Sequence, residues 1–256
     1  MNKEFNELVK NNFSLEGKRG IVTGGSAGIG KAISITLAKA GAEVFVFSRS
    51  GKFKSEGEPL ENIHHLKVDI VDTEQCKEFV AEIGKEGLDI LVNNTGISSK
   101  NKIVNLNIEY WNRIQNVNVN SAMNLSRFSY PYLKKAEDIG RIINITSMAA
   151  YLGFNKVVPY TVSKTALLGL TRGLAVEWAD ENILVNSVSP GWIKTDMLEK
   201  VLDEERERKI LNRMPLHKYG TPEDIANMVW YLVSPAVKYI TGQDFSVDGG
   251  ALAFGY

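Results

Sequence analysis

Short β-branched runs alternate with segments of helical periodicity along the chain, and this alternation limits the fold more than any other feature. Seven runs are predicted as strands, at residues 20–23, 43–48, 64–69, 89–93, 141–146, 184–188 and 245–247. Segments of helical period lie between them, at residues 30–40, 73–84, 108–133, 159–178 and 221–232. Apolar strands that alternate with helices indicate a parallel sheet covered on both faces. The sequence therefore predicts one doubly wound α/β domain.

Two regions depart from the alternation. Residues 1–15 form a short polar extension, predicted to be a surface arm ahead of a single domain at 16–256. Residues 192–219 interrupt the strand–helix rhythm between the sixth strand and the last helix. Loops that follow the carboxyl ends of strands hold ligands in this architecture, so this segment is predicted to be a lid. The alternative is an ordinary pair of surface helices.

Composition excludes several classes of protein. The 256 residues carry 30 basic and 30 acidic side chains, and a zero balance argues against a general nucleic-acid binder. No apolar run approaches the roughly 18 residues of a membrane span, and the N-terminus has no apolar signal core. Cys76 is the only cysteine, so no intrachain disulfide is expected. With only three histidines (His64, His65 and His217), we expect no metal, and we predict a cytoplasmic protein with a small-molecule substrate.

The first predicted strand runs into a glycine-rich turn at residues 23–30 and then directly into a helix. Glycines let the backbone approach a pyrophosphate, and the helix N-terminus offers unpaired N–H donors. The predicted phosphate-binding residues are Gly24, Ser26, Gly28, Ile29 and Gly30. The spacing G-x-x-x-G-x-G resembles that of the short-chain dehydrogenase/reductase family, which implies a Rossmann fold that binds a nicotinamide dinucleotide.

The end of the second strand bears on the choice of cofactor. An acidic residue there would hold a ribose 2′-hydroxyl, whereas this chain has Ser48 and Arg49, followed by Lys52 and Lys54. Arg49 offers a 2′-phosphate a bidentate, charge-assisted partner, so we predict NADP(H) ahead of NAD(H). Asp69, with Ile70 after it, matches the position at which the family usually holds the adenine. A strand-ending Asp can also simply cap a turn.

Two further segments match the family around the nicotinamide. The segment from Asn93 to Gly96 reads Asn-Asn-Thr-Gly, where the family usually shows Asn-Asn-Ala-Gly, and the departure is Thr95. The segment 190–195 resembles the one that lies over the nicotinamide carboxamide. The resemblance assigns cofactor contacts there to Pro190, Gly191, Ile193 and Thr195.

The pattern Tyr-x-x-x-Lys occurs twice, as Tyr130/Lys134 and Tyr160/Lys164, and only the second pair has a serine thirteen residues upstream, Ser147. Residues four apart on a helix share one face. Lys164 and an oxidised nicotinamide could thus lower the pKa of Tyr160 from about 10 toward neutrality. The prediction makes Tyr160 the general acid/base and Ser147 the hydrogen-bond donor to the substrate oxygen, with Tyr160 and Lys164 also contacting the cofactor.

A fourth catalytic residue is assigned by the resemblance. In the family pattern a Trp precedes the catalytic Asn by seven residues, and here Trp111 precedes Asn118. That Asn typically interrupts its helix. Asn116 and Asn120 lie close by, and periodicity does not choose among the three.

The resemblance implies interconversion of a ketone and a secondary alcohol, without metal. The segment 214–243 is similar both to gluconate and deoxygluconate dehydrogenases and to 3-oxoacyl-carrier-protein reductases. We expect Glu137-Asp138 and Asp180-Glu181 at the site mouth, where they would repel an acidic carrier protein, so a sugar or sugar acid is the preferred substrate. Basic side chains that could meet an anionic or polyol substrate are Lys156, Lys194, Arg213 and His217.

Two alternatives stay open, a 3-oxoacyl-carrier-protein reductase and a catalytically silent NADP-binding sensor or scaffold. The complete set of Asn118, Ser147, Tyr160 and Lys164 argues against the sensor, because a binding module needs no general base. The closing segment 242–250 resembles the family's last strand, which often packs across a twofold axis. A homotetramer is therefore expected by resemblance.

Overall fold

The computed structural model describes residues 2–53, 60–195, 198 and 203–254. Its strands form one parallel seven-stranded sheet in the order β3-β2-β1-β4-β5-β6-β7. The order reverses between β1 and β4, and ligands bind beyond the carboxyl ends of the strands at such a switch point. The strand bounds are Arg19–Thr23 (β1), Glu43–Ser48 (β2), Ile63–Lys67 (β3), Ile90–Asn93 (β4), Gly140–Ile145 (β5), Ile183–Pro190 (β6) and Asp244–Val247 (β7).

The predicted doubly wound fold is confirmed, and each predicted strand is present. β3 ends at Lys67, two residues before the predicted end at Asp69. The strands β1, β4 and β5 are buried at almost every position, which explains why their sequences are apolar on both faces. β3 and β7 form the two edges of the sheet and are only partly buried.

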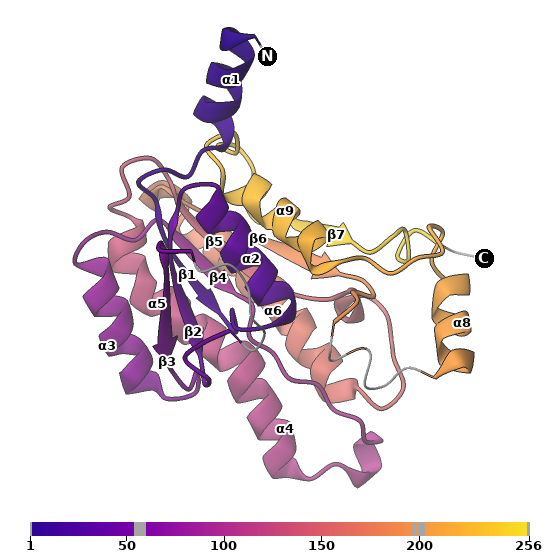
Figure 1. Cartoon of the computed structure of the whole chain (residues 1–256). Helices are drawn as coiled ribbons and strands as arrows, with labels where there is room; N and C mark the ends of the chain where they lie inside the picture. Colours follow the sequence, from indigo (N-terminus) through magenta and orange to yellow (C-terminus); the bar gives the residue numbers. More distant parts are fainter. Residues whose placement is uncertain (1, 54–59, 196–197, 199–202, 255–256) are drawn as a thin grey trace.

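Helices cover both faces of the sheet (Figure 1). One layer contains α2 (Gly28–Lys39) and α9 (Pro222–Val233), whose core side chains include Ile33, Leu37 and Val229. The other layer contains α3 (Thr73–Gly84), α5 (Ser121–Leu133) and α6 (Val158–Glu177). Within the described ranges, no helix combines the length and the apolar character that a membrane crossing would need.

The helix predicted at 108–133 is interrupted. It consists of α4 (Ile108–Gln115), a π-helical turn η2 (Asn116–Asn120) and α5. Short 3-10 turns occur at η1 (Ile103–Asn105), η3 (Met148–Ala150) and η4 (Ala179–Glu181). A π-turn is rare and often marks a functional site, so the residues of η2 are candidates for the site of this protein.

The N-terminal extension is helical. Helix α1 (Lys3–Phe13) has no buried residue and projects away from the sheet (Figure 1). Its last turn contacts the body: the Phe13 ring lies edge-on to Trp230 with 5.9 Å between ring centroids, and Trp230 Nε1 donates to the Phe13 carbonyl at 2.9 Å. Leu15 is fully buried in the core, so the packed part of the chain begins before residue 16.

The segment predicted as a lid leaves and rejoins the body at one place. Ile193 and Gly220 form a parallel bridge, in which Lys194 N donates to Gly220 O at 2.8 Å and Gly220 N donates to Trp192 O at 3.0 Å. Helix α8 (Glu204–Asn212) lies on this excursion and stands apart from the sheet (Figure 1). Residues 196–197 and 199–202 of the predicted lid lie outside the described residues.

Candidate active site

The predicted catalytic residues meet at the carboxyl edge of the sheet. Ser147 follows the end of β5, while Tyr160 and Lys164 lie in the first turns of α6. Pro159 occupies the first turn of that helix, where its missing N–H leaves no bond unmade. The structure therefore brings together side chains that are up to 46 positions apart in the sequence, from Asn118 to Lys164.

Lys164 is buried beneath the Tyr160 ring. Its Nζ lies 5.6 Å from the ring centroid and donates to the carbonyl oxygen of Ile145 at 2.7 Å. Burial lowers the pKa of the Lys164 ammonium to about 8, because removal from water disfavours the charged form. Lys164 is therefore mostly protonated at neutral pH, but it loses its proton at a lower pH than an exposed lysine does.

Two opposing effects act on the pKa of Tyr160. Burial raises the pKa of its phenol, because the tyrosinate would lose hydration. Ser147 acts in the opposite direction and lowers the pKa, but burial is the larger effect. The predicted fall toward neutrality, which requires an oxidised nicotinamide as well as Lys164, stays a prediction.

The Ser147 side chain interacts with two partners, Ala149 and Tyr160. Its backbone is extended, and its Oγ accepts a hydrogen bond from Ala149 N at 3.1 Å, which caps η3. The same side chain makes the hydrogen bond with Tyr160. The cap fixes the direction of the hydroxyl, so Ser147 faces the phenol without further adjustment.

Asn118 lies in the π-turn and is almost fully buried. Its Oδ1 accepts from Ile97 N at 2.8 Å, and its Nδ2 donates to Ile97 O at 2.9 Å and to Ser163 Oγ at 2.8 Å. Asn120, by contrast, donates from an exposed position to Asn116 Oδ1 at 2.6 Å. Among the three asparagines, Asn118 alone reaches the segment after β4.

Gly96 marks the point where these groups converge. A Cβ placed on Gly96 would lie 3.3 Å from Lys164 Nζ and 3.6 Å from Asn118 Oδ1. Contacts of that length leave little room for a side chain. A glycine at this position therefore lets the backbone approach the ammonium and the amide closely.

The glycine-rich turn fits a dinucleotide phosphate. Gly24 and Gly28 have φ of +64° and +50°, a backbone region that favours glycine. Helix α2 begins at Gly28 with no side-chain cap from Ala27 and no acidic residue in its first turn, so its first N–H groups are available to an anion. A Cβ on Gly28 would lie 3.4 Å from Thr195 Cγ2, which brings the start of the predicted lid against this turn.

The other predicted glycine-turn residues support the same geometry. A Cβ on Gly30 would lie 2.4 Å from the Gly24 carbonyl oxygen, so helix and turn approach too closely for any side chain. Ser26 is buried, and Ile29 packs against the core beneath α2. At the opposite side, a Cβ on Gly191 would lie 2.6 Å from Asp248 Cα, and Ile193 is buried. Gly191 follows Pro190, the last residue of β6.

Asn93 was predicted to contact the cofactor, and this stays a prediction. Its side chain is buried and donates to Asn144 Oδ1 at 2.9 Å and to Ser126 Oγ at 3.2 Å, so its Nδ2 is directed into the protein interior. Asn94, which the sequence prediction did not select, is the residue that binds the glycine turn: its Nδ2 donates to Thr23 O at 2.9 Å. Thr23 Oγ1 in turn accepts from Asn94 N at 2.9 Å and Thr95 N at 3.0 Å. The sequence did contain a signal for this role. Successive strand residues point to opposite faces, so one of two adjacent asparagines is expected to point toward the core and the other away from it.

Two other cofactor predictions concern the ends of β2 and β3. Ser48 Oγ accepts from Gly51 N at 3.2 Å, and Arg49 and Lys52 are exposed. Arg49 has no hydrogen-bond or ion-pair partner among the described residues, and Lys54 lies outside them. Asp69 Oδ1 accepts from Val71 N at 3.3 Å. This bond is the turn cap that the sequence analysis gave as the alternative role of Asp69. Ile70, between these two residues, is half-buried.

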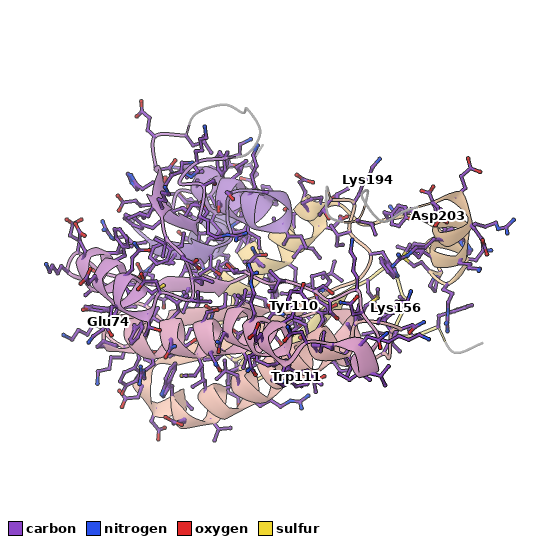
Figure 2. The ribbon with its side chains drawn as sticks, turned by 90° about the horizontal axis from the view of Figure 1, so that it is seen from below. Glu74, Tyr110, Trp111, Lys156, Lys194 and Asp203 are labelled. Carbon is purple, nitrogen blue, oxygen red and sulfur yellow. The ribbon has the colours of Figure 1, made fainter. Side chains whose placement is uncertain are left out.

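The charge prediction for the site mouth is wrong. Residues 137–138 precede β5 and residues 180–181 precede β6, so both acidic turns lie at the amino edge of the parallel sheet, opposite Ser147. Asp138 there accepts from Arg141 Nη2 at 3.1 Å. The loops at the carboxyl edge instead carry exposed Lys100, Lys102, Lys156 and Lys194. In Figure 2, Lys156 and Lys194 lie on the half of the molecule that carries Asp203, away from Glu74.

The other Tyr-x-x-x-Lys pair, Tyr130 and Lys134, lies elsewhere. Tyr130 and Lys134 are at the end of α5, with Lys134 Nζ 4.9 Å from the Tyr130 ring centroid and Trp178 5.0 Å from it. No serine reaches this tyrosine within the described chain. Across the same described ranges, no group of three or more His, Cys, Asp or Glu side chains is arranged to hold a metal ion.

Comparisons with known proteins agree with this geometry. A family model described as Enoyl-(Acyl carrier protein) reductase matches residues 24–251. The chain is 40% identical over 240 residues to the 3-oxoacyl-[acyl-carrier-protein] reductase FabG of Rickettsia bellii, covering 93% of this chain and 98% of that one. It is 36% identical over 247 residues to the 2-dehydro-3-deoxy-D-gluconate 5-dehydrogenase of Bacillus subtilis, covering 94% and 97%.

Solved structures are similar over almost the whole chain. One from Beutenbergia cavernae, assigned as an NAD(P) dependent gluconate 5-dehydrogenase with NADP bound at low occupancy, superposes with a TM-score of 0.85, at 34% identity and with 94% and 99% of the two chains covered. A 7α-hydroxysteroid dehydrogenase with NADH and a 7-oxo bile acid superposes with a TM-score of 0.86, at 33% identity, covering 94% and 96%. The chain therefore belongs to the short-chain dehydrogenase/reductase family, whose members are oxidoreductases that act on CH–OH groups with NAD(P).

Proposed function

We propose that this chain is an NADP(H)-dependent oxidoreductase that interconverts a ketone and a secondary alcohol, with Tyr160 as the general acid/base. The observation that carries the proposal is the position of the Tyr160 ring 5.6 Å from the buried ammonium of Lys164, with Ser147 close enough to lower the pKa of the phenol. A structural tyrosine would not need a buried cation beneath its ring. A proton donor does, because the tyrosinate left after transfer is stabilised by the nearby charge.

The residues divide the work as follows. When bound, the nicotinamide supplies or accepts the hydride. Gly24, Gly28 and the first N–H groups of α2 hold the phosphates, and Thr195 closes the turn from the opposite side. Ser147 donates a hydrogen bond to the substrate oxygen, on which charge develops, while Tyr160 exchanges the proton.

The same tyrosine serves both directions of the proposed reaction. Reduction of a ketone uses the Tyr160 phenol as the proton donor, and oxidation of the alcohol uses the tyrosinate as the acceptor. Burial disfavours the tyrosinate, so oxidation depends on the nearby positive charge of Lys164 to stabilise it.

The proposed preference for NADP(H) rests on the end of β2. No acidic residue occurs at positions 48–53, and Arg49 and Lys52 are exposed there. Among the described residues Arg49 has no partner, so its guanidinium is available to a 2′-phosphate. NAD(H) remains the second choice, since the similar hydroxysteroid dehydrogenase was solved with NADH.

The proposed substrate is a keto sugar acid. The lysines in the loops at the carboxyl edge of the sheet would attract an anion, and several similar proteins carry gluconate or deoxygluconate dehydrogenase names. The second candidate is a 3-oxoacyl-carrier-protein reductase. It is favoured by the similarity to FabG, and the acidic turns no longer oppose it because they lie at the other edge.

Three further features belong to the proposal. Residues 192–219 would act as a lid, which the closed base at Ile193 and Gly220 and the position of Thr195 beside Gly28 support. A homotetramer is supported by the family and by the half-buried edge strand β7. A cytoplasmic location is supported by the single, unpaired Cys76.

The experiment is NADPH oxidation with 5-ketogluconate and an acetoacetyl thioester as parallel substrates, each repeated with NADH. Turnover of the keto sugar acid alone supports the first substrate proposal, and turnover of the thioester alone replaces it with the acyl reductase. A sensor or scaffold would bind NADPH without oxidising it in the presence of either ketone. A clear preference for NADH would contradict the role of Arg49.

A further inference from the structure

A buried polar row runs from the carboxyl ends of β5 and β6 to the first residue of β7, beside Ser147. Thr146, Ser187 and Ser189 are almost completely buried, and all three lie within hydrogen-bond distance of a polar side chain of the row. Asp244, the first residue of β7, provides the only carboxylate among them. A buried hydroxyl destabilises the fold unless it forms a hydrogen bond. The Asp244 carboxylate provides acceptor oxygens for hydroxyls of the row and so offsets the free-energy cost of burying them.

The two oxygens of Asp244 reach both ends of the segment that carries Ser147. Oδ1 lies 3.1 Å from Thr146 Oγ1, directly before Ser147, and accepts from Ser187 Oγ at 2.5 Å. Oδ2 accepts from the Tyr151 hydroxyl at 2.9 Å, just after η3. One side chain, 97 positions away from Ser147 in the sequence, therefore holds the catalytic turn at its entrance and at its exit.

The hydroxyl hydrogens can satisfy this arrangement. Thr146 Oγ1 and Ser189 Oγ are 2.6 Å apart, and the Ser189 hydroxyl can donate to Thr146. The single hydrogen of Thr146 then goes to Asp244 or to the Val188 carbonyl oxygen, which is 2.9 Å away. The Tyr151 bond has no such alternative among the described residues, so it depends on Asp244 alone.

The Tyr151 contact is the exposed end of the row, because Tyr151 is 47% exposed. Desolvation and the hydrogen bond to Asp244 raise the pKa of the Tyr151 phenol to about 12, so the hydroxyl stays a donor at neutral pH. A hydroxyl that donates to a carboxylate makes a charge-assisted bond. Water competes with this bond on its exposed side, so it stabilises the exit of the turn less than a fully buried bond of the same kind would.

We propose that Asp244 is a positioning residue, which acts through Thr146 and Tyr151 to fix the Ser147 turn against Tyr160. This inference rests on the proposed function of Ser147 and Tyr160. Residues that hold a catalytic group in place contribute to the rate without touching the substrate, since small displacements of the reacting groups slow the chemical step.

The first measurement is hydrogen–deuterium exchange of the backbone amides between Ser147 and Leu152. We compare wild type, Tyr151→Phe, Asp244→Asn and the double variant. Asn keeps one acceptor oxygen for Thr146 and Ser187 but offers Tyr151 an NH₂ group in place of the second oxygen. Faster exchange confined to this turn in both single variants is expected, and wild-type exchange in either would overturn the proposal.

The second measurement is steady-state reduction of whichever ketone the wild type turns over. We expect kcat to fall about tenfold in each single variant with the KM for NADPH unchanged. The double variant should fall no further than Asp244→Asn, because Tyr151 acts through the same carboxylate. A change in thermal midpoint with an unchanged kcat would mean that the row is only structural, and would overturn the proposal.

Two variants keep the outcomes distinct. Ser246→Ala lies on the same strand at an exposed position with no side-chain hydrogen bond among the described residues, and it should match wild type in both measurements. Tyr160→Phe tests the proposed function itself. If Tyr160→Phe stays active, the proposed chemistry fails; if it is inactive while Tyr151→Phe and Asp244→Asn behave like wild type, only the role of Asp244 fails.

Discussion

The ammonium of Lys164 donates to the carbonyl oxygen of Ile145 at 2.7 Å, two residues before Ser147. This bond joins α6 to the end of β5. The cation is therefore held by a neutral oxygen, and among the described residues no carboxylate forms an ion pair with it. In the proposed mechanism, its charge is available to the tyrosinate that forms when Tyr160 gives up a proton.

Lys164→Met should change how stability depends on pH. The folded-state pKa of about 8 lies below the ordinary value of 10.5, so the burial penalty is fully present below pH 8 and disappears as pH rises to 10.5. Wild type should gain about 3 kcal/mol relative to Lys164→Met across this interval, from the size of the shift. Urea unfolding of both proteins at pH 7 and pH 10.5 measures the difference.

Lys134→Met is the matched control for that experiment. Lys134 is exposed, and its hydrogen bond to Tyr130 raises its pKa, so any stability it contributes is present below pH 10.5 and lost only above it. Wild type should gain nothing relative to Lys134→Met between pH 7 and 10.5. An equal gain against both variants would show that Lys164 does not titrate as described.

Tyr160→Phe should abolish ketone reduction while leaving the binding of NADPH intact. The substitution removes the proton donor but keeps the ring over Lys164, and loss of a general acid costs about 10²–10⁴-fold in rate. Fluorescence titration with NADPH and a spectrophotometric rate measurement give the two values. Tyr130→Phe removes the hydroxyl from the other Tyr-x-x-x-Lys pair and should retain wild-type turnover.

Much of the fold could be predicted from the sequence because the central strands are buried on both faces. β1, β4 and β5 are therefore rich in Ile, Leu and Val at consecutive positions, and the bounds of α3 were predicted without error. The helix α1 was not predicted. Its apolar residues, such as Phe5 and Leu8, are exposed, so nothing in the core imposes a pattern on that segment.

The site was harder to predict where side-chain direction or burial decides. Asn93 and Asn94 are adjacent and chemically identical, yet strand alternation sends one into the core and the other to the glycine turn. The raised pKa of Tyr160 follows from burial, which a spacing motif does not encode. The acidic turns lie at the amino edge because they precede β5 and β6, and all turns that precede strands of a parallel sheet lie there.

Arg49→Asp should shift the cofactor preference from NADPH to NADH. A carboxylate at the end of β2 would repel a 2′-phosphate and accept a hydrogen bond from the 2′-hydroxyl. The ratio of kcat/KM for the two cofactors should fall by about 100-fold, which corresponds to about 3 kcal/mol. Lys52→Asp makes the same charge change three residues further along the exposed turn. A larger shift in this ratio from Lys52→Asp than from Arg49→Asp would show that Lys52, and not Arg49, binds the 2′-phosphate.

Asn118→Ala should destabilise the protein as well as inactivate it. The variant would leave the N–H and the carbonyl of Ile97 without their partner and would remove one donor to the Ser163 hydroxyl, and unsatisfied buried groups cost about 1–3 kcal/mol each. A loss of about 3 kcal/mol is expected in urea unfolding, because the Ser163 hydroxyl keeps its own bond to Tyr160 O at 2.7 Å.

Asn120→Ala is the matched control for Asn118→Ala, because periodicity did not distinguish these asparagines. Its side chain is exposed and bonds only to Asn116 Oδ1 within the described chain, so the expected loss is below about 0.5 kcal/mol, with turnover unchanged. Both variants alter the same π-turn by the same truncation. Equal effects on stability and turnover would therefore contradict the assignment, since the turn itself would then matter more than the amide that reaches Ile97.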